Sequence, residues 1–211
     1  MKLLAFDLST RRGTIALANE KEILGARDWP NDHRSSAPFF EALDEIIREH
    51  GRPETIVVGL GPGSYTGTRI AISAAIGLEA TTGGALAGIS SLCAISDEND
   101  FCVIGDAKRA SFFFAKISDG LLKSDPELLS ADEMNKRISS ITTIPIYTSD
   151  ELPQFTGVEM RFPSAKLLCL RAQTFPQNLA RAPLAPIYLR EPHITTPRSA
   201  QNDGKTLPLL G

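Results

Sequence analysis

The first 25 residues alternate short apolar runs with polar turns. Apolar runs occupy residues 3–6, 14–18 and 23–25, and the polar stretches 9–13 and 19–21 separate them. Runs of this length between turn-forming residues are typical of β-strands, and short connections favour antiparallel neighbours. The pattern therefore predicts a three-stranded antiparallel meander at the start of the chain.

A helix, a strand and a second helix follow the meander. Ser36 is a candidate N-cap and Gly51 a candidate helix end. Between them apolar side chains recur at helical spacing: Phe39, Phe40, Leu43, Ile46 and Ile47. The apolar run 55–58 predicts a buried strand, and the residues from Thr68 to about Ala80 predict the second helix.

The same order of elements then starts again. The apolar run 101–104 is followed by Asp106, which lies 99 positions after Asp7 at the end of the first run. At this offset the next two strands keep their register without a gap, which predicts a duplicated lobe. The second copy continues with a helix opened by Ser130, a strand at 144–147 and a helix from Ser164 to about Thr174.

These elements predict an α/β protein divided into three parts. Residues 1–97 form an N-terminal lobe that includes a glycine-rich loop, and residues 98–190 form a smaller C-terminal lobe. Residues 191–211 contain three prolines among polar residues and predict a loose tail. A tail that docks on the body is the alternative.

Composition narrows the classes of function. The 211 residues carry a formal net charge of −3, which disfavours an RNA-binding module because no general attraction to nucleic acid is present. Cys93, Cys102 and Cys169 lack metal-binding spacing and predict buried thiols in a reducing compartment. No apolar run approaches the length of a membrane span. We therefore expect a soluble, cytoplasmic protein.

The segment 61–69, Gly-Pro-Gly-Ser-Tyr-Thr-Gly-Thr-Arg, lies between a predicted strand and a predicted helix. Glycine-rich loops at this position commonly hold phosphate groups. The spacing matches neither the Walker A pattern nor the GxGxxG pattern, and Pro62 removes one amide donor. A tight turn in which Ser64 or Thr66 caps the helix is the simpler interpretation.

Four segments resemble the TsaB family, also called YeaZ. Residues 61–69 are similar to its GPGSFTGxR signature, and residues 4–10, LAFDLST, to its opening LAIDTST. Residues 104–109 are similar to its DAR hairpin, and residues 186–190, PIYLR, to its closing PxYLR. The chain departs from the family pattern at three positions: Leu8 for Thr, Tyr65 for Phe and Lys108 for Arg.

This resemblance implies an actin-like, sugar-kinase-like (ASKHA) fold made of two ribonuclease H-like lobes, the second one reduced. It also implies a non-catalytic scaffold subunit that pairs with the catalytic subunit TsaD and works with the ATPase TsaE. The reaction of these subunits transfers threonylcarbamoyl to a tRNA adenosine. The resemblance also implies that tRNA contacts this chain only through the complex. In isolation the chain is expected to form a homodimer.

The alternative function is a small actin-like ATPase or kinase. Asp7 and Asp106 end strands that begin hairpins, which is where such enzymes place carboxylates for a metal–phosphate complex. The second phosphate hairpin and the adenosine loop are missing, so we expect both carboxylates to accept hydrogen bonds from turn amides. His33, His50 and His193 lack the spacing of a paired metal site. We predict no catalytic, cofactor-binding or metal-binding residue.

The second predicted helix is apolar on nearly all sides, so all sides need cover. We expect the sheet to cover one side, formed by Ile70, Ala71, Ala74, Ala75 and Leu78. The other side, formed by Arg69, Ile72, Ser73 and Ile76, then requires either the first helix or another subunit. These four residues are the predicted partner interface.

Overall fold

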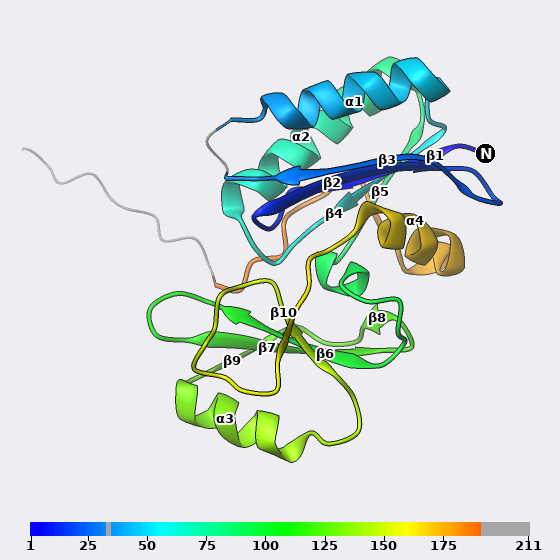
Figure 1. Ribbon diagram of the computed structural model, residues 1–211. Helices are drawn as coiled ribbons and strands as arrows, with labels where there is room; N and C mark the ends of the chain where they lie inside the picture. The colour runs from blue at the N-terminus through cyan, green and yellow to red at the C-terminus, as the bar shows by residue number, and fades with distance from the viewer. Residues whose placement is uncertain (33–34, 191–211) are drawn as a thin grey trace, which may run out of the picture.

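The computed structural model describes residues 1–32 and 35–190, which form two mixed α/β sheets layered with helices (Figure 1). Helices α1 and α2 cover the outer face of the first sheet, and α4 lies between the two sheets. Helix α3 covers the outer face of the second sheet. The predicted tail at 191–211 lies outside the described residues.

The first sheet has the order β12-β5-β4-β1-β2-β3. Strands β1, β2 and β3 form the predicted antiparallel meander. On the other side of β1, β4 and β5 extend the sheet and run parallel to β1. The elements are β1 (Leu3–Asp7), β2 (Arg12–Ala18), β3 (Ile23–Pro30), α1 (Ala37–His50), β4 (Thr55–Gly59), α2 (Tyr65–Thr82) and β5 (Ala85–Ile89). Helix α2 begins three residues before the predicted start, because Ser64 caps it.

The second sheet has the order β11-β10-β6-β7-β8, and β9 also pairs with β7. Its elements are β6 (Phe101–Asp106), β7 (Phe112–Ser118), β8 (Leu121–Leu122), β9 (Glu127–Leu129), α3 (Ala131–Ser140), β10 (Ile146–Thr148) and β11 (Glu159–Met160). Both sheets place a hairpin beside two parallel strands in the same order, which confirms the predicted pair of ribonuclease H-like lobes. No helix joins β10 to β11, whereas α2 joins β4 to β5, so the second lobe is reduced.

The predicted register between the two copies is wrong by one residue. Six residues lie between the paired Asp7 and Thr14, whereas five lie between the paired Asp106 and Phe112. The second hairpin closes with one residue fewer because three consecutive residues, 108–110, adopt positive φ values of 64°, 55° and 56°. The repeat is therefore real in topology but not continuous in sequence.

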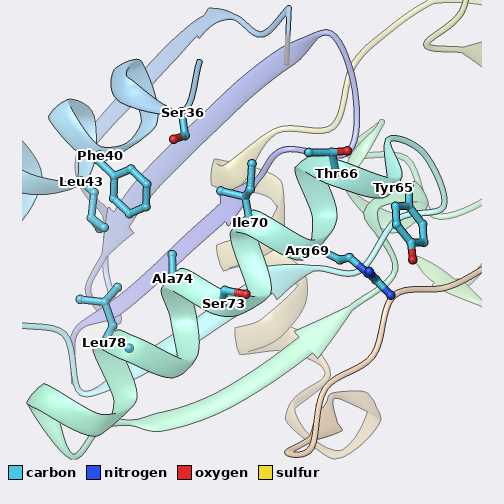
Figure 2. A pocket seen from close by; sticks show the side chains of 11 residues that line it. Ser36, Phe40, Leu43, Tyr65, Thr66, Arg69, Ile70, Ser73, Ala74 and Leu78 are labelled. Atoms are coloured by element: carbon cyan, nitrogen blue, oxygen red, sulfur yellow. The ribbon is translucent and has the colours of Figure 1, made fainter. Parts of the chain in front are cut away.

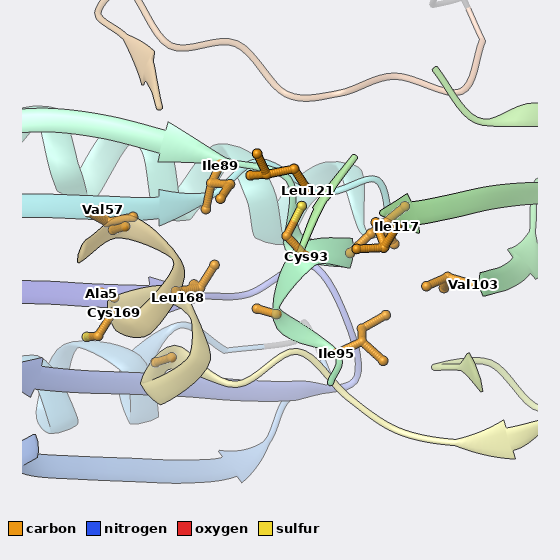
Figure 3. Close-up of a cluster of buried hydrophobic side chains, with 14 of the residues drawn as sticks. Ala5, Val57, Ile89, Cys93, Ile95, Val103, Ile117, Leu121, Leu168 and Cys169 are labelled. Carbon is orange, nitrogen blue, oxygen red and sulfur yellow. The ribbon is translucent and has the colours of Figure 1, made fainter. Parts of the chain in front are cut away.

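Three apolar layers hold the fold together. One lies between the first sheet and α1 and α2, and another between the second sheet and α3. The third and largest lies between the sheets, around α4 (Ala165–Thr174) and the short helix η1 (Ser91–Ala94) (Figure 3). Leu168 and Cys169 of α4 are fully buried there. Cys93 and Cys102 are also buried, as predicted, and burial raises the pKa of Cys93 to about 11.

The end of the described chain returns to the first sheet. Helix α4 packs on β1 and β2, and after η2 (Pro176–Asn178) the strand β12 (Ala180–Arg181) pairs with β5. The segment 98–190 thus contributes to both sheets, and the division at residue 97 stays a prediction. None of the described helices combines the length and apolar character that a membrane span needs.

Arg171 of α4 ties that helix to the connection between the two sheets. The side chain is 3% exposed, and its guanidinium donates to the carbonyl oxygens of Cys93, Ser96 and Glu98 and to Asn99 Oδ1. These donors satisfy backbone acceptors that the 3-10 helix and the turn after it leave free. A buried cation therefore replaces backbone hydrogen bonds at this position.

We expect Arg171→Met to lower the free energy of unfolding by about 3 kcal/mol, because buried carbonyl groups lose their donor. Urea denaturation followed by circular dichroism measures this change. Lys166→Met is the matched control, since Lys166 is exposed on the same helix. Equal unfolding midpoints for the two variants would contradict this role for Arg171.

Candidate functional site

The glycine loop between β4 and α2 is built against the first turn of the chain. Ser64 N donates to Ser9 O over 2.6 Å, and Gly63 lies so close that a Cβ there would be 2.2 Å from Ser9 O. The Ser64 side chain accepts from Gly67 N, so Ser64 is the predicted cap. Gly61 N donates to Ser91 Oγ over 2.8 Å. The glycines therefore allow two backbone segments to meet, and several loop amides bond within the chain.

Asp7 is sealed beneath this loop. Its Oδ1 accepts from Ser9 N and Ser9 Oγ, its Oδ2 accepts from Ser91 Oγ, and the residue is fully buried. A Cβ on Gly59 would lie 1.8 Å from Oδ2, so only glycine fits beside the carboxylate. Burial raises the pKa of Asp7, although the hydrogen bonds from Ser91 and Ser9 act in the opposite direction.

Asp106 occupies the matching position in the second lobe and is partly exposed. It accepts from Lys108 N over 2.7 Å and from Lys108 Nζ over 2.8 Å. The hydrogen bond from the Lys108 side chain is the main reason that the pKa of Asp106 is lowered. The prediction that both aspartates accept hydrogen bonds from turn amides is confirmed.

A cleft of about 480 Å³ separates the two lobes on the side of these turns. The glycine loop, Asp106, Lys108 and Asp150 line it, and Arg11 forms an ion pair with Glu151 across it. The Arg11 guanidinium also lies 5.5 Å from the centre of the Phe162 ring. Within residues 1–32 and 35–190, no three or more His, Cys, Asp or Glu side chains form a group that could hold a metal ion.

Helix α2 presents a different outer face from the one predicted. Arg69, Ser73 and Ile76 are exposed as expected, and Ile76 retains 50% of its accessible surface. Ile72 is only 6% exposed and belongs to the core beneath the helix. Its place in the predicted interface is therefore wrong, because the sheet covers a stripe formed by Gly67, Thr68, Ala71, Ile72 and Ala75.

An open apolar groove of about 810 Å³ runs between α1 and α2 (Figure 2). Phe40 and Leu43 of α1 face Ile70, Ala74 and Leu78 of α2 across it. Helical spacing predicts Phe40 as a core residue, yet Phe40 is 47% exposed, whereas Phe39 is 1% exposed. Two adjacent phenylalanines cannot share one helical face, and that signal in the sequence could have identified the groove.

Tyr65 and Arg69 form the rim of the groove at the start of α2. Tyr65 is 47% exposed, and its ring centre lies 5.6 Å from that of Tyr188 in the last described segment. In the sequence, Tyr65 stands out only as a departure from a family pattern, and nothing indicates a contact for Tyr188. The pairing joins residues 123 positions apart, which no local pattern indicates.

A model of the family described as “TsaD: tRNA N6-adenosine threonylcarbamoyltransferase” matches residues 38–167. An uncharacterised protein of Mycobacterium tuberculosis is 26% identical over 201 residues, which cover 90% of this chain and 92% of that protein.

Two solved structures from Pseudomonas aeruginosa are similar in fold. One is described as an uncharacterised protein with similarity to the peptidase YeaZ, with a TM-score of 0.70, 20% identity, and coverage of 90% of this chain and 99% of that chain. The other, YeaZ, has a TM-score of 0.68 at 20% identity, with coverage of 89% and 99%. The two-lobed α/β fold predicted from the sequence is therefore the fold of YeaZ.

We expect Asp7→Asn to increase stability at neutral pH. The pKa of the Asp7 carboxyl is raised in the folded state. A group of this kind stabilises the fold fully at pH values below its unfolded-state pKa, and that stabilisation is lost as pH rises through its folded-state pKa. The free energy of unfolding of the wild type minus that of Asp7→Asn should therefore fall as pH rises from 4 to 8. Urea denaturation across this range measures the difference, and a difference that rises with pH would contradict the prediction.

Proposed function

We propose that this chain, which belongs to the TsaD family of tRNA N6-adenosine threonylcarbamoyltransferases, serves as its non-catalytic, TsaB-type partner subunit. In this role it pairs with a catalytic TsaD-type subunit, works with a TsaE-type ATPase and reaches tRNA only through the complex. In isolation the same surface forms a homodimer. The reaction supported is threonylcarbamoyl transfer to a tRNA adenosine.

The observation that carries this proposal is the uncovered outer layer formed by α1 and α2. Phe40 and Tyr65 line the apolar groove and each expose about half of their surface, and Ile76, which lies on α2 outside the groove lining, exposes half of its own. An open apolar groove beside exposed apolar side chains is typical of an association surface. Arg69, Ser73 and Ile76 remain the proposed contact residues of α2, joined by the groove residues of α1.

The surroundings of the two aspartates support a scaffold role rather than phosphoryl transfer. Asp7 is fully buried and already accepts three hydrogen bonds from Ser9 and Ser91. A metal-bound phosphate needs carboxylate oxygens that face the cleft. Asp106 does face the cleft, but Lys108 occupies both of its oxygens. The glycine loop also uses the amides of Gly61 and Ser64 internally.

The cleft between the lobes is the feature that favours the alternative, a small actin-like ATPase or kinase. It has a volume of about 480 Å³ and contains both cationic and acidic side chains. Binding and hydrolysis of ATP with magnesium by the purified chain separate the two functions, because an ATPase or kinase requires both and a scaffold subunit requires neither.

We expect no saturable hydrolysis of ATP by the purified chain in the presence of magnesium, since Asp7 is sealed and Asp106 is paired with Lys108. Release of inorganic phosphate over a range of ATP concentrations measures this. The alternative would be supported by a saturable activity that Asp106→Ala abolishes without shifting the unfolding midpoint.

We expect Ile76→Glu to leave the chain folded while it prevents association with the TsaD-type subunit. The substitution places an unpaired carboxylate in a desolvated interface, at a cost of about 2 to 4 kcal/mol, or roughly 30-fold or more in affinity. Isothermal titration calorimetry measures the affinity, and size-exclusion chromatography measures the loss of the homodimer.

Leu170→Glu is the matched control for this variant. Leu170 is 45% exposed on α4, which lies on the opposite face of the first sheet from α2. This control is expected to bind like the wild type. Normal pairing by folded Ile76→Glu would move the interface elsewhere, and unfolding of that variant would place Ile76 in the core.

A further inference from the structure

Arg69 is a cation held in a fixed position at one end of the α1–α2 groove. Its guanidinium carbon lies 4.0 Å from the centre of the Tyr65 ring, and its Nε and Nη2 atoms donate to Tyr188 Oη over 3.4 and 3.3 Å. Figure 2 shows the side chain extending from α2 beside Tyr65. Cation–π contact and two weak hydrogen bonds restrict a side chain that is otherwise free in solvent.

A third segment of the chain fixes the position of Tyr188. Ile187 N donates to Leu60 O over 2.8 Å, so the segment before Tyr188 is attached to the start of the glycine loop. The preceding strand β12 pairs with β5 of the first sheet. The position of Arg69 is therefore set by α2, by the glycine loop and by the last described segment together.

The charge of Arg69 is not neutralised by a carboxylate. Within residues 1–32 and 35–190, Arg69 takes part in no ion pair, and the groups around it are the neutral hydroxyls and rings of Tyr65 and Tyr188. Other arginines of the described chain do pair with carboxylates: Arg11, Arg12, Arg27, Arg48, Arg137 and Arg161. A held cation without an anionic partner suits a ligand that brings its own carboxylate.

The groove beside this cation is apolar over the length of two to three helical turns. Arg69 and Leu78 both line it, and the nine steps from one residue to the other rise about 14 Å along an α-helix. Arg69 is the cationic residue among those that line the groove. A polyanion such as RNA needs several cations along its path, so this surface does not suit it.

We propose that Arg69 selects the docking partner by pairing with a carboxylate at one end of an amphipathic helix whose apolar side chains fill the α1–α2 groove. This inference rests on the proposed function, because the partner helix belongs to the TsaD-type subunit. Apolar contacts along the groove supply most of the affinity, and the ion pair sets the direction in which the helix lies. Tyr65 and Tyr188 are positioning residues for the guanidinium.

The test compares Arg69→Gln with wild type for binding to the purified TsaD-type subunit of the same organism, at 50 and 500 mM salt. Arg69→Gln is expected to lose about tenfold in affinity at low salt, and its affinity should depend less on salt than that of the wild type. Arg48→Gln is the control, because Arg48 is an exposed arginine of α1 that does not line the groove.

Variants of Tyr188 test the positioning role. Tyr188→Phe keeps the ring and removes the acceptor, whereas Tyr188→Ala removes both, so the loss of affinity should increase in that order and stay below that of Arg69→Gln. Tyr188→Ala in the Arg69→Gln background should add little, since the guanidinium is already absent.

The outcomes separate this inference from the proposed function. If the wild type binds the TsaD-type subunit and Arg69→Gln binds it with the same affinity and the same salt dependence, the inference is overturned and the partner role stays intact. If the wild type does not bind the TsaD-type subunit at any protein concentration tested, the proposed function and this inference both fail.

Discussion

The fold depends on the apolar layer that the two sheets share. Each sheet has one face covered by its own outer helices, and its inner face requires cover from elsewhere. Helix α4 supplies that cover for the first sheet, while η1 and the inner side chains of β6 and β7 complete the layer. Because α4 follows the second sheet and all strands of the first sheet except β12, the first lobe buries its inner face only when the distant end of the sequence returns to it.

Local pattern predicts most of the elements and the α/β class, because short apolar runs and helical spacing report burial directly. It failed where three-dimensional contacts decide the outcome. Local pattern does not predict β5, a strand of the first sheet, or η1, in the layer between the sheets, because neither has a periodic pattern of its own. It also does not predict β9 and β11, which are short edge strands. The one-residue difference between the hairpins depends on a left-handed turn at 108–110, which contains no glycine to mark it.

The error at Ile72 has a specific physical cause. A helix that is apolar nearly all round has a weak directional signal, so its sequence predicts the helix but not its rotation about the axis. The buried stripe begins with Gly67 and Thr68, which a hydrophobicity pattern does not mark as core. It is therefore rotated by about 60° from the expected stripe at 100° per residue. This rotation buries Ile72, leaves Ile76 exposed and turns Ile70 toward the groove.

The position of Tyr65 links the two surfaces that the fold leaves open. Its ring lines the groove between α1 and α2, and it also lines the cleft between the lobes. Contacts with Arg69 and Tyr188 hold the ring from the side of the groove, while the glycine loop determines where α2 begins beside the cleft. A partner that fixes this ring in the groove also fixes one wall of the cleft. The family signature at 61–69 is therefore best understood here as the junction between the α1–α2 groove and the cleft between the two lobes, rather than as a loop shaped around a phosphate.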